Sequence, residues 1–157
     1  MASATATLNR RGTSEIYIGG AGDTRTRLVA AYAEARQRDF AHEAHHDAHY
    51  FPHYALRRIL NLARQHADAG RTLILVGHSW GGDTALRVLK ALQPRRVDLL
   101  VCVDPVPKSR LNPPPTPRNA RRIIHVDARP SHPNRSDQVK EMGQWFGGTL
   151  RRRLSSA

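Results

Sequence analysis

A serine between two glycines is the strongest chemical signal in this sequence. Ser79 lies in Gly77-His78-Ser79-Trp80-Gly81, directly after four apolar residues and directly before a helical pattern. A G-x-S-x-G pentapeptide between a strand and a helix is the context of a nucleophilic serine held at a sharp turn. The flanking glycines allow a close approach of neighbouring elements that side chains would prevent. The pattern predicts that the Ser79 hydroxyl attacks a carbonyl carbon and that the Trp80 N–H stabilises the resulting oxyanion.

The segment Val76–Gly82 resembles the nucleophile elbow of the α/β-hydrolase family, which includes lipases, esterases and thioesterases. The resemblance is strong over this segment and weak over most of the remaining chain. It implies a minimal form of the fold: a three-layer α/β/α sandwich around a mostly parallel sheet of five to six strands. It also implies a serine hydrolase that cleaves a small-molecule or lipid-like carboxylic ester or thioester through an acyl-enzyme.

A nucleophilic serine needs a base within hydrogen-bond reach and an acid that orients the base. In the family the acid and then the histidine follow the serine along the chain. After Ser79 the histidines are His125, inside a predicted strand, and His132, in the loop beyond it. The resemblance therefore implies His132 as the base and Asp104, at the end of the preceding strand, as the acid. Asp127 is the alternative acid.

A glycine-rich segment, residues 19–22, follows the first predicted strand. In the family the loop after an early strand supplies the second oxyanion donor. A dinucleotide-binding turn is the competing interpretation, but Arg25 occupies the position of its third glycine. An ordinary strand–helix turn also remains open. The resemblance implies these residues around the oxyanion and substrate: Gly20, Ala21, His78 and Trp80.

The chain has 157 residues, which suggests one domain. We expect a disordered lead over 1–13, an α/β-hydrolase-like domain over 14–150 and a basic tail over 151–157. The single cysteine, Cys102, falls in a predicted strand and is expected to be a buried, inert thiol. Neither a secretory signal nor a membrane-spanning run is recognisable. A cytoplasmic protein is the default expectation, with export by a signal-less route left open.

The net charge is +12, almost entirely from arginine. Such a charge can indicate a nucleic-acid or membrane partner, but the arginines are scattered and no binding motif is recognisable. Specific nucleic-acid binding is therefore not predicted, and the oligomeric state is left open. Because little chain follows His132, a catalytically inactive binding module that lacks the family's terminal histidine segment is the alternative function.

Five histidines and two acidic residues crowd into residues 42–53. His42, His45, His46 and His49 have helical spacing, and some of them with Glu43 could hold a divalent metal. The spacing matches no metal motif closely, so neither a metal nor a cofactor is assigned. The simpler expectation is a strand near 39–43 followed by a polar loop over the site.

The remaining patterns place the other elements. Asp23 or Thr24 is expected to cap a helix that continues to about residue 38. Pro52 is expected at the start of a helix that ends at Gly70. An extended loop over 108–117 would form the rim of the site, and a strand over 121–126 would precede a final helix ending near residues 147–148.

Overall fold

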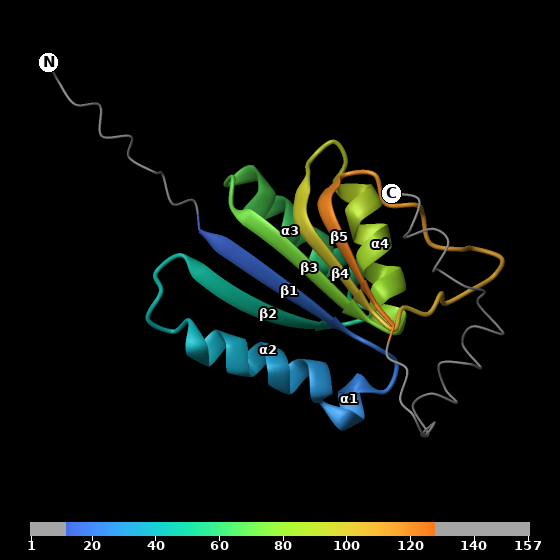
Figure 1. Ribbon diagram of the computed structural model, residues 1–157, viewed down its shortest axis with the longest axis horizontal. Coiled ribbons are helices and arrows are strands. Elements are labelled where there is room, and N and C mark those ends of the chain that lie inside the picture. The colour runs from blue at the N-terminus through green and yellow to red at the C-terminus, as the bar shows by residue number, and fades with distance from the viewer. Residues whose placement is uncertain (1–11, 128–157) are drawn as a thin grey trace, which may run out of the picture.

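Parallel strands form the centre of the fold (Figure 1). The computed structural model describes residues 12–127. Within them a five-stranded sheet has the order β2-β1-β3-β4-β5, and every neighbouring pair is parallel. The strands are β1 (Thr13–Gly19), β2 (His46–Pro52), β3 (Thr72–His78), β4 (Val97–Val103) and β5 (Ala120–Val126). Parallel pairing brings the carboxyl ends of all these strands to the same edge of the sheet.

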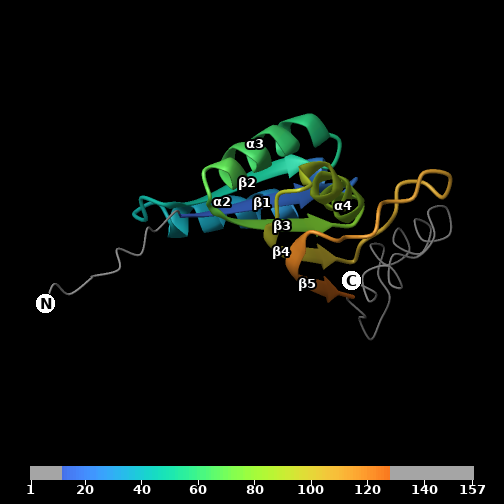
Figure 2. The same cartoon turned by 90° about the horizontal axis from the view of Figure 1, so that it is seen from above.

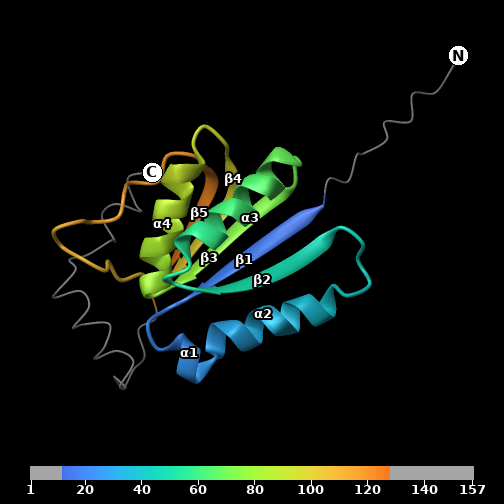
Figure 3. The ribbon, with the colours of Figure 1, turned by 180° about the vertical axis from the view of Figure 1, so that it is seen from behind.

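The helices lie on both faces of the sheet, as the sequence predicts. They are α1 (Asp23–Thr26), α2 (Leu28–Asp39), α3 (Leu56–Asp68) and α4 (Trp80–Leu92). Figure 2 shows α3 and α4 together on one face of the sheet, and Figure 3 shows that α3 lies over the strands β1 and β3. The helix α2 packs against β2 and β1 on the other face. This arrangement is the predicted three-layer α/β/α sandwich.

The main core lies between the sheet and the helices α3 and α4. Ile16 and Ile18 of β1 point to this side and are fully buried, as are Leu73 and Leu75 of β3. The next residues along β1, by alternation, face α2: Tyr17 packs edge-on against Tyr32 of that helix, at 5.4 Å between ring centroids. Helices therefore cover both faces of β1, whereas the residues of β3 and β4 on the α2 side are only partly buried.

The helix predicted from residue 23 to about 38 is interrupted at Arg27, which has a positive φ of 54° and separates α1 from α2. Asp23 is nevertheless a helix cap. Its Oδ1 atom accepts a hydrogen bond of 2.8 Å from the Val29 N–H, in the first turn of the second helix rather than the first. The Asp23 carboxylate therefore caps α2 from the other side of the interruption at Arg27. The sequence pattern predicts a cap only for the helix that begins at Asp23 itself.

The histidine-rich stretch differs from both of its sequence interpretations. It is neither a helix nor a strand near 39–43, because the strand is β2 and residues 40–45 form a turn. Pro52 is the last residue of β2 and does not begin the next helix, which starts at Leu56. The polar side chains of β2 are tolerated because they find distant partners: His46 contacts Glu15 at 3.0 Å, and Asp47 contacts Arg71 at 2.6 Å.

The strands around the elbow and the helix after it are confirmed: β3, β4, β5 and α4 lie where the apolar runs predict them. Residues 104–119 have no regular secondary structure, in agreement with the expected extended loop. Among the described residues, no helix is long and apolar enough to cross a membrane. The basic tail over 151–157 and the expected final helix lie outside the described residues.

Candidate functional site: a row of residues at the carboxyl edge of the sheet

Ser79 occupies a strained turn between β3 and α4. Its backbone has φ 54° and ψ −121°, a conformation that costs a residue with a side chain about 1–3 kcal/mol. Backbone hydrogen bonds hold it there. The Ser79 N–H donates to the Val103 carbonyl at 3.0 Å, and its own carbonyl accepts from Gly82 at 2.9 Å and from Val106 at 3.1 Å. Three different segments thus maintain the serine in the conformation of an elbow.

The two glycines of the pentapeptide are required by close backbone contacts. A Cβ at Gly77 would lie 2.4 Å from the Gly81 carbonyl oxygen, and a Cβ at Gly81 would lie 2.1 Å from the carbonyl oxygen of Ile18. Both distances are far inside van der Waals contact with a backbone atom, which cannot rotate away as a side chain can. The first turn of α4 therefore rests directly on the end of β1.

The loop after β1 lies against Ser79. A Cβ at Gly20 would lie 2.9 Å from the Ser79 Cβ and 3.1 Å from the His78 carbonyl oxygen. The Gly20 carbonyl accepts a hydrogen bond of 3.2 Å from the Asp23 N–H, which holds the loop in a turn. The loop expected to carry an oxyanion donor is therefore beside the serine, with Gly20 buried and Ala21 exposed.

Trp80 is the first residue of α4. The first four N–H groups of a helix have no carbonyl partner within the helix, and the helix dipole makes this end partly positive. The Trp80 N–H belongs to this group and directly follows Ser79. A developing negative charge beside the serine would thus meet a helix N-terminus, in addition to the loop at Gly20.

The register of the sheet places the residues that directly follow the five strands level with one another. Gly19 pairs with Pro52, Ile18 with Gly77, His78 with Val103, and Val103 with Val126. Continuing each pairing past its strand gives one row across the carboxyl edge, in the spatial order of the strands: His53, Gly20, Ser79, Asp104 and Asp127. We call these five residues the edge row. Neighbouring members follow strands whose axes are about 4.8 Å apart.

Both acid candidates belong to the edge row. Asp104 follows the strand next to the serine's strand, and Asp127 follows the strand beyond it. The Asp104 N–H donates to the Val126 carbonyl at 2.8 Å, and its φ is 44°. A second non-glycine residue with positive φ, adjacent to Ser79 in the row, is a further strained position at this edge. The predicted base, His132, lies outside the described residues.

His53 is a member of the edge row that the motif search did not single out. Its ring meets the Trp80 ring edge-on, with 5.2 Å between centroids, and its Nδ1 atom is buried with no hydrogen-bond partner among the described residues. Burial and then the Lys108 charge lower the pKa of His53, so the ring is neutral at pH 7. The signal that could have found it is its position directly after β2. The Nδ1 atom of His78 is likewise buried and unpartnered among those residues.

A buried carboxylate fastens the loop 104–119 to the elbow helix. Asp83, in the first turn of α4, is fully buried, contacts Arg87 at 2.5 Å and accepts the Lys108 N–H at 2.9 Å. The Lys108 ammonium donates to the His53 carbonyl at 2.9 Å and to the Thr84 hydroxyl at 2.7 Å. These contacts join the β2–α3 connection, the elbow helix and the expected rim of the site into one unit.

A cavity of about 520 Å³ lies on the α2 side of the sheet. Val76, Val101 and Val103 form part of its apolar wall, and His78 lines it as well. Ser79 is not among the residues that line this cavity, although its neighbour His78 is. The candidate metal ligands of the sequence do not form a group at this edge: His42 and His45 are exposed in the turn before β2.

Comparison with known protein families agrees with this geometry, although no curated protein and no solved structure matches the chain. One family does match, described as the alpha/beta hydrolase fold, and the match extends over residues 20–129. It therefore covers more than half of the chain and includes all five residues of the edge row. With its parallel sheet, strained serine and glycine-packed turn, the chain belongs to the α/β-hydrolase fold family.

Proposed function

We propose that the protein is a serine hydrolase that cleaves a carboxylic ester or a thioester of a small-molecule or lipid-like substrate through an acyl-enzyme. The observation that carries the proposal is the backbone of Ser79, a non-glycine residue kept at positive φ between a strand and a helix N-terminus. Strain of this kind persists where the surrounding structure imposes it, and it clusters at active sites. The adjacent Gly20 loop supplies the setting for a second oxyanion donor.

In the proposed reaction the Ser79 oxygen attacks the carbonyl carbon while His132 accepts the hydroxyl proton. The N–H groups of Trp80 and Gly20 stabilise the negative oxygen of the tetrahedral intermediate, and each such donor is typically worth about 10²–10³ in rate. The imidazolium then gives its proton to the leaving alcohol or thiol as the carbon–oxygen or carbon–sulfur bond breaks. Water hydrolyses the acyl-enzyme by the same route. Asp104 orients the imidazole, with Asp127 as the alternative acid.

A fluorophosphonate probe tests the nucleophile, because it reacts with an activated serine. We expect wild-type protein to be labelled and Ser79→Ala to remain unlabelled at an unchanged circular-dichroism spectrum. A folded wild-type protein that stays unlabelled, or equal labelling of Ser79→Ala, contradicts the proposal. The first of these results supports the inactive binding module instead.

Turnover of a p-nitrophenyl ester tests the base and the acid separately. Loss of a triad member is expected to reduce kcat by about 10⁴–10⁶-fold, so His132→Ala should be nearly inactive. His53→Ala is the matched control, since it removes the imidazole that belongs to the edge row. Activity that survives in His132→Ala and disappears in His53→Ala would move the base to the β2–α3 connection. Asp104→Asn compared with Asp127→Asn identifies the acid in the same assay.

A further inference from the structure

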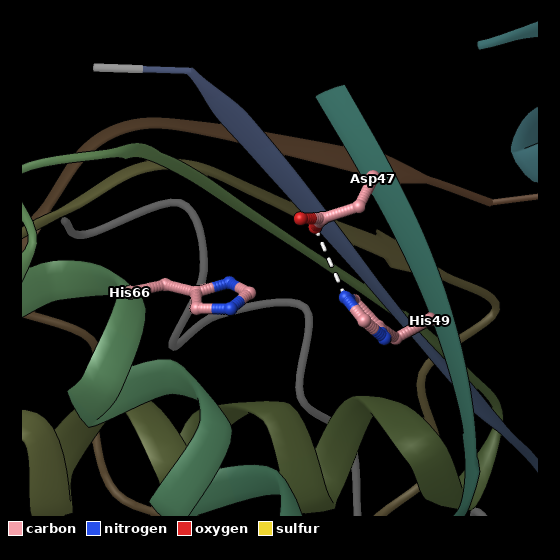
Figure 4. Close-up of side chains that lie close together, drawn as sticks. All are labelled: Asp47, His49 and His66. Carbon is pink, nitrogen blue, oxygen red and sulfur yellow. Dashed lines mark hydrogen bonds and ion pairs between the residues drawn. The ribbon is translucent and has the colours of Figure 1, made fainter. Parts of the chain in front are cut away.

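A second cluster of chemically active side chains lies far from the edge row. Asp47 and His49 on β2 point toward α3, and His66 of α3 points back toward them (Figure 4). By register Asp47 is level with Ser14, which in turn is level with Leu73, six residues before Ser79. At about 3.3 Å per residue, the cluster is about 20 Å from the nucleophile along the sheet. It is therefore independent of the proposed hydrolytic site.

The three residues offer ligand atoms to a common point. One nitrogen or oxygen from each lies within 4.8 Å of the other two, and the Asp47 Oδ1 atom is 3.0 Å from the His49 Nε2 atom. Two ligand atoms bound tetrahedrally to Zn²⁺ at about 2.1 Å are about 3.4 Å apart. The ligand atoms, 3.0 Å apart for Asp47 and His49 and within 4.8 Å for the other pairs, are thus close to this spacing.

Ser14 holds one nitrogen of His66. The His66 Nδ1 atom lies 2.5 Å from the Ser14 hydroxyl oxygen. With Nδ1 engaged by Ser14, Nε2 is the nitrogen of His66 that remains for a metal ion. A histidine ligand whose other nitrogen donates to a fixed partner is the usual arrangement at metal sites.

An arginine fixes the orientation of the Asp47 carboxylate. Arg71 contacts Asp47 Oδ2 at 2.6 Å, which fixes the carboxylate and leaves Oδ1 facing His49. The same positive charge reduces the affinity for a cation.

We propose that Asp47, His49 and His66 form a binding site for one divalent transition-metal ion. Two imidazole nitrogens and one carboxylate oxygen are a donor set that suits Zn²⁺, with water in the fourth position. Because Asp47 and His49 belong to the edge strand β2 while His66 belongs to α3, a bound ion joins this edge of the sheet to the helix that covers it. Its role at this position is structural, and Ser14 is a positioning residue.

Zinc titration of the full chain by calorimetry tests the site. We expect one Zn²⁺ per chain, and binding at least about tenfold weaker in His49→Ala and in His66→Gln. Ser14→Ala is expected to weaken binding by about 10–100-fold without removing a ligand. The exposed His42 and His45 provide the matched control, because the double variant His42→Ala/His45→Ala removes two histidines from the same stretch and should bind zinc as the wild type does.

Three results would overturn the site: no zinc binding by the wild type, undiminished binding by His49→Ala, or binding lost in the His42→Ala/His45→Ala variant. The partly exposed His49 carries the test if the buried His66→Gln fails to fold. Cobalt substitution adds a second measurement, since wild-type protein should show the visible absorption of tetrahedral Co²⁺ and His49→Ala should not. The Ser79→Ala protein should bind zinc normally, so failure of the hydrolase proposal leaves this test unaffected.

Discussion

Replacing Ser79 with glycine should stabilise the protein while abolishing its proposed chemistry. The strained backbone costs about 1–3 kcal/mol when a Cβ is present, and glycine removes that cost. The greater freedom of glycine in the unfolded chain opposes the gain by about 0.5–1 kcal/mol. The balance favours Ser79→Gly by roughly 0.5–2 kcal/mol. At about 2–4 °C per kcal/mol for a chain of this size, Tm should rise by roughly 1–8 °C.

Ser79→Ala isolates the cause of this effect, because alanine keeps the Cβ and therefore the strain. The Ser79 side chain makes no hydrogen bond that caps α4, so loss of its hydroxyl should change the free energy of unfolding by no more than about 0.5 kcal/mol. Thermal and urea melts of wild type and both variants provide the measurement. A glycine variant no more stable than the alanine variant would refute the argument that the elbow stores strain.

Three other predictions concern stability and reactivity. Gly81→Ala should lower the free energy of unfolding by about 1–3 kcal/mol or more in urea melts, because its Cβ would strike the Ile18 carbonyl, whereas Gly22→Ala meets nothing within 4 Å and should be nearly neutral. Burial opposes ionisation of Glu15, but hydrogen bonds and a neighbouring arginine hold its pKa below the ordinary value of 4.5. The Glu15 carboxylate therefore takes up a proton at higher pH in the unfolded chain than in the folded chain, so the free energy of unfolding falls as pH drops below about 4.5. Glu15→Gln should weaken this pH dependence in melts between about pH 5 and 3. Burial raises the pKa of the Cys102 thiol to about 12, so a disulfide reagent should modify it only after denaturant is added; rapid labelling of the native protein would contradict its burial.

The elbow and its strand could be predicted from the sequence because their signals are local. The apolar run before Ser79, the two glycines and the helical pattern after it are consecutive, and each has one physical meaning. The apolar strand before Asp104 is equally local. In each case one face of the strand is buried under α3 and α4 and the other face lines the apolar cavity, so apolar residues occupy both faces.

The histidine-rich strand could not be predicted in the same way. Its polar residues are compatible with β2 only because Glu15 and Arg71 supply partners from other elements. Such partners are separated along the chain, so no window of consecutive residues contains the explanation. The grouping of His49 with His66 has the same origin, since it requires α3 to return across the sheet.

The edge row depends on strand register, which hydrophobic periodicity does not specify between distant strands. The elbow and the strand ends indicate four of its residues individually: Ser79, Asp104, Asp127 and Gly20. The sequence indicates His53 only as part of a histidine cluster. The pairing of Gly19 with Pro52 is the fact that puts it beside the others.

The contact between Gly81 and the Ile18 carbonyl has a consequence for how such a protein can diversify. Because α4 rests on the end of β1, Ser79 and the loop at Gly20 are held together, and a mutation that displaces one of them also displaces the other. New substrate preferences would therefore have to arise by exchange of residues in the irregular segment beyond Lys108, because Val106 and Lys108 themselves hydrogen-bond to the Ser79 carbonyl and to Asp83.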